Sequence, residues 1–181
     1  MASKDVNLYI VGFMGTGKST IGRAVAQRLR MDFLDSDHEI ERITGRRITE
    51  IFESGGEPDF RRMEREFIEK GHPARGFVIA CGGGLIIPDG MLEAVSSRGV
   101  VICLHASIAT IVDRVSRNKN RPLLAVDDAV TEATDLYMRR EPVYRRAGTT
   151  VLTEGRSIFE TMHHVERVYQ REAREWARAH P

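Results

Sequence analysis

A chain of 181 residues is long enough to bury one sizeable core and too short for two ordinary domains. Its composition of 41% hydrophobic and 29% charged residues excludes a disordered chain, and its net charge of +1 argues against a broad surface for nucleic acid or membrane. We therefore predict a single domain over residues 1–181.

The apolar runs and the N-terminal segment bear on where the protein works. No run has the length needed to span a bilayer, and the opening MASKDVNLY lacks the order of basic, apolar and small residues found in a secretion signal. Cys81 and Cys103 each stand at or near the end of an apolar run, so we predict reduced core thiols. We expect a cytoplasmic protein without membrane or nucleic-acid partners.

Short apolar runs alternate with segments of helical period, which indicates an α/β fold with a parallel sheet covered on both faces. Gly71 and Gly99 follow helical stretches and are predicted C-terminal caps, while Ser107 and Ser157 are predicted N-terminal caps. The predicted strands cover residues 8–11, 33–34, 77–81, 100–104 and 150–152, the clearest helices cover residues 19–30 and 60–70, and residues 118–128 are predicted to form a mobile loop.

The first strand runs into GFMGTGKS, which matches G-x-x-x-x-G-K-[ST] at every fixed position and is followed by a helix. In such a P-loop the bare glycine backbone lets N–H groups converge on phosphate oxygens, Lys18 supplies a mobile cation, and Ser19 offers a hydroxyl to Mg²⁺. We expect the nucleotide to contact Gly15, Thr16, Gly17, Lys18, Ser19 and Thr20. A P-loop alone does not name a reaction, because kinases, motor ATPases and switch GTPases share it.

Two aspartates follow the second strand, in FLDSDHEIE. Ligands bind at the carboxyl ends of strands in open α/β sheets, so one carboxylate could face the nucleotide metal and the other a second substrate. Helix capping is the alternative. It would account for Asp37 but leave Asp35 without a role.

Glycines and arginines dominate the rest of the chain. CGGG, ending at Gly84, follows the third strand, where three consecutive glycines could expose backbone N–H groups to a small ligand or admit it closely. A plain loop turn is the alternative. Arginine suits phosphate and carboxylate because its planar fork donates paired hydrogen bonds. The arginines in question are Arg61, Arg62, Arg114, Arg117, Arg121, Arg139, Arg140, Arg145 and Arg146. Nucleic-acid binding is the rival explanation, but no such signature accompanies them.

Seven stretches together resemble the shikimate kinase family in order and spacing, over nearly the whole chain: GFMGTGKSTIGR, FLDSDHEIE, GEPDFRRME, CGGG, RNKNRPLL, REPVYRR and EGRS. The resemblance implies a three-layer P-loop fold similar to nucleoside-monophosphate kinases, with a five-stranded parallel sheet. It also implies a substrate-binding region at about residues 37–62, a lid at about residues 114–126, and ATP-dependent phosphorylation of the 3-hydroxyl of shikimate in aromatic amino acid biosynthesis.

The resemblance also implies a role for individual residues. On the nucleotide side, Lys18 would hold the β- and γ-phosphates, and Mg²⁺ would be bound by Ser19 directly and by Asp35 through water. Arg121 resembles the lid arginine that reaches the phosphates, while Arg114 and Arg156 resemble the residues that bracket adenine.

On the acceptor side, Asp37 resembles the aspartate that contacts the shikimate hydroxyls, and it would orient the reacting one. Arg61 and Arg140 resemble the pair that holds the carboxylate. Gly83 would contribute backbone, with Gly82 and Gly84 beside it. Catalysis would then rest on Lys18, Asp37 and Arg121.

Two other functions stay open. A gluconate-type or nucleotide kinase shares the P-loop and lid but needs a different acceptor socket. A catalytically silent paralogue would bind nucleotide and act through a partner. We expect a monomer that uses ATP, shikimate and Mg²⁺.

Overall fold

The computed structural model describes residues 6–116 and 127–180. It contains a five-stranded, fully parallel sheet in the order β2-β3-β1-β4-β5. The strands are β1 (Asn7–Val11), β2 (Asp32–Asp35), β3 (Phe77–Ala80), β4 (Gly99–His105) and β5 (Thr149–Leu152). The helices are α1 (Lys18–Leu29), α2 (Ser36–Thr44), α3 (Ile48–Lys70), α4 (Met91–Ser96), α5 (Ile108–Ser116), α6 (Asp127–Arg146) and α7 (Ile158–Ala179).

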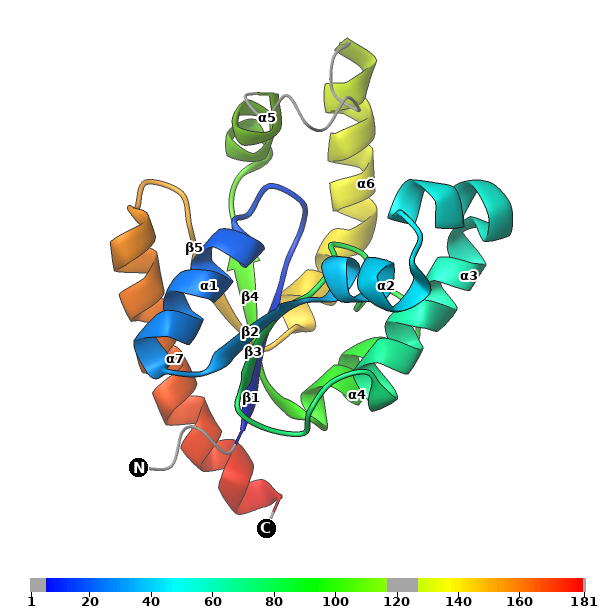
Figure 1. Ribbon diagram of the computed structural model, residues 1–181. Coiled ribbons are helices and arrows are strands. Elements are labelled where there is room, and N and C mark those ends of the chain that lie inside the picture. The colour runs from blue at the N-terminus through cyan, green and yellow to red at the C-terminus, as the bar shows by residue number, and fades with distance from the viewer. Residues whose placement is uncertain (1–5, 117–126, 181) are drawn as a thin grey trace.

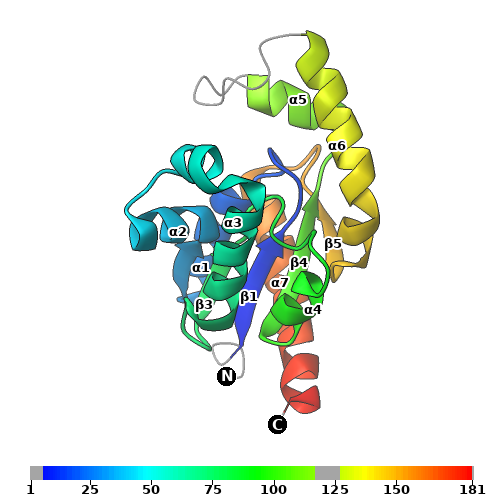
Figure 2. The same ribbon diagram turned by 90° about the vertical axis from the view of Figure 1, so that its right-hand side faces the viewer.

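Helices cover both faces of the sheet, as the continuous apolar strands predict. Helices α1 and α7 lie together on one face, and α2, α3 and α4 lie on the other (Figure 1). Helices α5 and α6 extend past the carboxyl ends of the strands (Figure 2). The predicted fold class is therefore confirmed.

The sheet separates two apolar cores. Along β1 the side chains alternate: Leu8 and Ile10 pack with α1 and α7, whereas Tyr9 and Val11 pack with the helices of the opposite face. All residues of β1 are buried, which is why its sequence shows no polar alternation.

Several predicted local features hold and others are wrong. Gly71 follows α3 as its cap, the Ser107 hydroxyl accepts a hydrogen bond from the Thr110 backbone N–H, and Ser157 forms a capping box with Glu160 at the start of α7. Gly99 is not a cap: it begins β4, where an added Cβ would lie 2.3 Å from the Asn7 carbonyl oxygen.

Helix α3 begins twelve residues earlier than the predicted start at residue 60, at Ile48, and it is kinked. Gly56 has φ 70° inside it, and Pro58 follows two residues later. A proline disfavours helical backbone in the residue before it, so the chain breaks and restarts here. The helical period in the sequence indicated only the part after this break.

Residues 117–126 lie outside the described part of the chain, and with them most of the predicted loop and Arg121. Asp127 and Asp128, the last two residues assigned to that loop, belong to α6. Cys81 and Cys103 are buried free thiols, as predicted. Among the described helices, none is long and apolar enough to cross a membrane.

Candidate active site

A cavity of about 560 Å³ opens at the carboxyl ends of the central strands. It brings together the P-loop, both aspartates, the glycine turn and three of the arginines from the sequence analysis. Its lining includes Gly15, Gly17, Lys18, Ser19, Thr20, Asp35, Asp37, Arg61, Glu64, Gly82, Gly83, Gly84, Arg114 and Arg140. Segments far apart in sequence therefore share one site.

The P-loop lies between β1 and α1 and is fixed against the neighbouring strand. Gly12 has φ 136°, and an added Cβ would lie 2.3 Å from the Leu104 carbonyl oxygen, so only glycine fits there. The Lys18 ammonium donates to the Phe13 carbonyl at 2.8 Å, and the buried Thr16 hydroxyl donates to the same oxygen at 2.8 Å. Lys18 is thus held within the loop, beside the space where a phosphate would lie.

Ser19 and Asp35, the two residues expected to bind Mg²⁺, contact each other. The Ser19 hydroxyl donates to Asp35 Oδ2 at 2.6 Å, and both residues line the cavity. Hydroxyl and carboxylate oxygens are ligands that Mg²⁺ accepts, and this ion commonly takes only one or two protein carboxylates beside substrate phosphates. The pair therefore fits the ion. No cluster of three or more His, Cys, Asp or Glu side chains suited to a metal occurs within residues 6–116 and 127–180.

Helix capping was the alternative role for Asp37, but in the structure a different aspartate caps the helix. Asp35, not Asp37, is the N-cap of α2, and its side chain accepts a hydrogen bond from the Asp37 backbone N–H. Asp35 has extended backbone angles as the last residue of β2, which suits an N-cap. The cap and the hydrogen bond from Ser19 both hold Asp35 in place, and Asp37 lines the same cavity.

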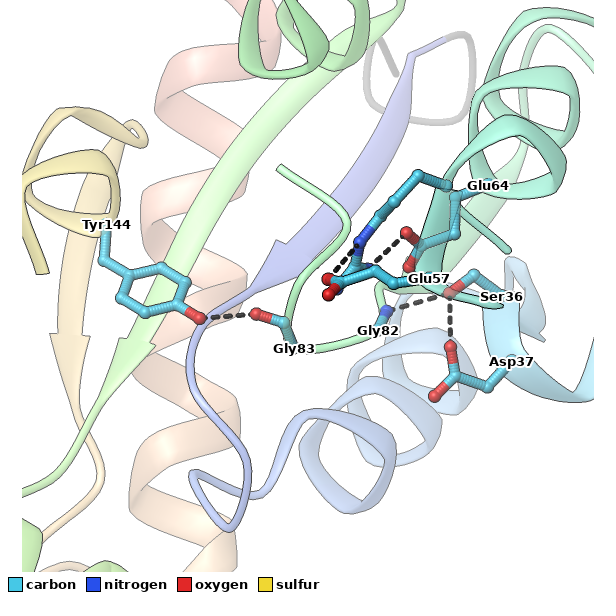
Figure 3. A network of polar contacts seen from close by, with 8 residues as sticks. Ser36, Asp37, Glu57, Glu64, Gly82, Gly83 and Tyr144 are labelled. Atoms are coloured by element: carbon cyan, nitrogen blue, oxygen red, sulfur yellow. Dashed lines mark hydrogen bonds and ion pairs between the residues drawn. The ribbon is translucent and has the colours of Figure 1, made fainter. Parts of the chain in front are cut away.

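Asp37 lies against the glycine turn, which we define as Gly82–Gly84. The hydroxyl of the fully buried Ser36 accepts from the Gly82 N–H at 2.8 Å and donates to Asp37 Oδ1 at 3.4 Å (Figure 3). An added Cβ on Gly82 would lie 2.4 Å from Asp37 Oδ1. We expected these glycines to bare their N–H groups for a ligand. At Gly82 the N–H is instead bound to Ser36, and the missing side chain makes room for Asp37.

Arg61 lies at the opposite end of the turn and is only 18% exposed. Its guanidinium donates to Glu64 at 2.5 Å and to Glu57 at 2.7 Å. An added Cβ on Gly84 would lie 2.4 Å from Arg61 Nη2, so the missing side chain here makes room for the guanidinium. This is not a solvated helix-surface arginine.

Glu64 was missed in the sequence. Its carboxylate is 1% exposed, and within the described part of the chain Oε1 has no hydrogen-bond partner. Burial raises the pKa of Glu64 to about 7, against the opposing effect of Arg61 and with a further rise from Asp37. A signal existed: Glu64 is four residues after Phe60 and three before Phe67, on the apolar face of α3.

Arg140 reaches the same cavity from α6. One turn later, the hydroxyl of the buried Tyr144 donates to the Gly83 carbonyl (Figure 3). Asp37, Arg61, Arg140 and the three glycines of the turn thus line one cavity. Tyr144 was not predicted to contribute.

The two arginines expected near adenine share a smaller cavity of about 230 Å³ beside the P-loop. Arg114 donates to the Gly15 carbonyl at 3.3 Å and to both oxygens of Thr153 at 2.9 Å. Arg156 lies 2.8 Å from His164 Nδ1. Both arginines and the P-loop residues Thr16, Gly17 and Thr20 line this cavity.

Comparisons with known proteins agree with the geometry. A family model described as shikimate kinase matches residues 14–170. A shikimate kinase from Thermodesulfovibrio yellowstonii is 39% identical over 165 residues, which cover 91% of this chain and 95% of the relative. A shikimate kinase from Burkholderia thailandensis is 44% identical over 158 residues, 86% of each chain.

Solved structures extend the comparison. A shikimate kinase from Acinetobacter baumannii in complex with shikimate has a TM-score of 0.85 and 37% identity, covering 94% of this chain and 96% of that chain. A gluconokinase from Sinorhizobium meliloti, at 16% identity and a TM-score of 0.66 over 95% of each chain, shares the fold. The family predicted from the motifs is therefore confirmed: the chain belongs to the shikimate kinase family.

Proposed function

We propose that this protein transfers the γ-phosphoryl group of ATP to the 3-hydroxyl of shikimate, giving shikimate 3-phosphate in the pathway to chorismate and the aromatic amino acids. One observation carries the proposal: Asp37, Arg61 and Arg140 line the same cavity as the P-loop. A carboxylate opposite two guanidinium groups complements a small molecule with hydroxyls at one end and a carboxylate at the other. The Acinetobacter relative with bound shikimate supports this choice of acceptor.

On the acceptor side, Arg61 and Arg140 hold the substrate carboxylate and Asp37 orients the 3-hydroxyl for in-line attack. Glu57 and Glu64 keep the Arg61 guanidinium in place. The substrate-binding region at about residues 37–62 supplies two of these three groups. Gly82, Gly83 and Gly84 complete the socket.

On the nucleotide side, Gly15, Thr16, Gly17, Lys18, Ser19 and Thr20 surround the phosphates. Ser19 and Asp35 would hold Mg²⁺, which supplies charge neutralisation to the phosphates when bound. Arg114 and Arg156 flank the adenine, and the segment at about residues 114–126 acts as the lid. Arg121 in that lid lies outside the described residues, and we propose that it reaches the transferred phosphoryl group.

Catalysis is then mostly alignment and charge neutralisation, because phosphoryl transfer passes through a loose transition state. Lys18 and Arg121 neutralise the moving group, and Asp37 fixes the direction of attack. Lid closure excludes water and so limits hydrolysis of ATP. We propose that the protein works as a cytoplasmic monomer.

A substrate panel tests the function. The purified chain with ATP and Mg²⁺ is expected to release ADP with shikimate, and not with gluconate or nucleoside monophosphates. Turnover of gluconate alone would identify a gluconate-type kinase. Nucleotide binding without turnover of any acceptor would identify a silent paralogue.

Substitution of the two arginines tests the acceptor site. Arg61→Lys and Arg140→Lys keep the charge but lose the planar fork, so each is expected to weaken shikimate binding about tenfold to a hundredfold, equivalent to about 1.5 to 3 kcal/mol. Because the two arginines share one anion, the double variant should fall short of additivity.

Calorimetric titration with shikimate and with a non-hydrolysable ATP analogue measures both affinities. Arg62→Lys is the matched control, because Arg62 is the next residue on α3 and pairs with Asp59 and Glu66 at the surface. Weakened binding of the ATP analogue with unchanged shikimate binding would place the two arginines on the nucleotide and contradict the assignment.

A further inference from the structure

Tyr144 connects two parts of the acceptor site that are distant in sequence. It lies on α6, one helical turn after Arg140, and the residue is 4% exposed. Its hydroxyl donates to the carbonyl of Gly83, 61 residues away (Figure 3). The function proposed above uses Arg140 and the glycine turn but gives Tyr144 no role.

The glycine turn has few other anchors. On one side the Gly82 N–H donates to Ser36, beside Asp37. Within the turn region, the Gly82 and Gly84 carbonyls accept from Leu85 and Ile87 at 3.1 and 3.0 Å. The carbonyl of Gly83, between them, is bound by Tyr144 on the opposite side. The turn is therefore anchored on two sides, by α2, which carries Asp37, and by α6, which carries Arg140.

The phenol ring itself is fixed by packing. The Phe13 ring of the P-loop meets it edge-on at a centroid distance of 6.3 Å, and the Tyr137 ring stacks on it at 6.5 Å. Burial raises the pKa of Tyr144 to about 12, while the nearby charge of Arg140 opposes the rise. The hydroxyl therefore remains a protonated donor at any pH at which the protein works.

We propose that Tyr144 is a positioning residue for the acceptor: its hydroxyl fixes the glycine turn to α6 and so sets the separation of Arg140 from Asp37 and Gly83. This inference rests on the function proposed above. A substrate held at its carboxylate end by Arg140 and at its hydroxyl end by Asp37 must match that separation. Loss of the hydroxyl lets the turn and α6 move independently, which weakens shikimate binding without touching the phosphate-binding loop.

Tyr144→Phe tests the proposal, because it removes one oxygen and keeps the packed ring. Tyr137→Phe is the matched control: this tyrosine lies on the same helix, is also buried, and its hydroxyl lies 3.2 Å from His105 Nδ1. Steady-state kinetics with each substrate, calorimetric titration with shikimate, and thermal unfolding are measured for wild type and both variants.

For Tyr144→Phe we expect the shikimate KM and Kd to rise about threefold to tenfold, as for loss of one neutral hydrogen bond. The ATP KM should stay within about twofold of wild type, and Tyr137→Phe should leave every constant unchanged. In an Arg140→Lys background, Tyr144→Phe should have a smaller effect than in wild type, because both act on one separation.

Two contrary outcomes are distinct. In the first, wild type turns over shikimate, and the shikimate KM and Kd of Tyr144→Phe equal those of wild type or of Tyr137→Phe. The positioning role is then wrong, and the proposed function stands. A Tyr144→Phe variant in which only the unfolding temperature falls would contradict the positioning role in the same way. If wild type binds ATP but neither binds nor phosphorylates shikimate, both proposals are wrong.

Discussion

A buried carboxyl group faces the acceptor cavity at Glu64, next to the guanidinium that we assign to the substrate carboxylate. Its pKa is raised to about 7 because burial disfavours the charged form more strongly than Arg61 favours it. A group whose pKa rises on folding binds its proton more tightly in the folded state. Glu64 therefore contributes stability at low pH that is lost as the pH rises from about 4.5 to about 7.

Glu64→Gln is expected to remove this part of the pH dependence. The free energy of unfolding of wild type, relative to the variant, should fall between about pH 5 and pH 8 by on the order of 2 to 3 kcal/mol, since a pKa difference of one unit corresponds to about 1.4 kcal/mol. Urea unfolding at a series of pH values measures it. Glu66→Gln, an exposed site on the same helix, is the control and should follow wild type. A flat difference between wild type and Glu64→Gln would show that the carboxyl titrates alike in both states.

Single residues were predictable where a motif fixes them and not where three-dimensional packing does. Ser19 and Asp35 come together because α1, which begins at the P-loop, packs against β2 and β3. Glu64 and Tyr144 escaped because an acidic residue on a helix and a tyrosine after an arginine have many ordinary explanations. Only the burial of both side chains singles them out.

Among the structural elements, the glycine turn has its sequence determined by the side chains that pack against it. Gly82 leaves room for Asp37 and Gly84 for Arg61, and in each case the displaced atom would be the end of a side chain. A methyl group at either position can therefore be accommodated by moving that side chain. The fold survives, but the site changes.

The two substitutions should affect different kinetic constants. Gly82→Ala displaces Asp37, so we expect kcat to fall by up to about a hundredfold through misorientation of the hydroxyl. Gly84→Ala displaces Arg61, so we expect mainly a shikimate KM raised about tenfold. Steady-state kinetics beside circular dichroism distinguishes them, with each variant as the control for the other. Identical losses in both constants would mean that the turn acts only as a unit.

The strands and the helices with a clear apolar period were largely predictable, whereas α2, α6 and the first half of α3 were not. The run before Pro58 carries two glycines, which weaken a helical pattern in sequence. In the structure Gly56 takes up the kink and Ile51 is buried, so tertiary packing decides the conformation. Gly99 was wrongly predicted to be a cap, because a glycine after a helical stretch has more than one explanation. In the structure it allows β1 and β4 to approach closely.

In the whole molecule, the helices α2, α3 and α6, which carry Asp37, Arg61 and Arg140, pack in one of the two cores. Ile40 of α2, Phe67 of α3 and Tyr144 of α6 belong to the cluster that contains Tyr9 and Val11, while α1 and α7 pack in the other cluster. A shift of α3 or α6 on substrate binding therefore needs repacking on one face of the sheet only.

Hydrogen exchange should show this asymmetry. Added shikimate is expected to slow amide exchange in α3, α6 and the glycine turn, and to leave α7 unchanged. An ATP analogue should slow exchange in the P-loop and at the start of α1. Equal slowing of α7 by shikimate would mean that both faces respond together.

The alternation along β1 has a consequence for cooperativity. Leu8 and Ile10 belong to one core, Tyr9 and Val11 to the other, and the same strand leads into the P-loop. Loss of either core would remove the packing partners of two side chains of this central strand. The helices on the two faces can adjust separately to ligands while the sheet is intact. When the sheet unfolds, both cores are expected to unfold together with it, and so is the P-loop that follows β1.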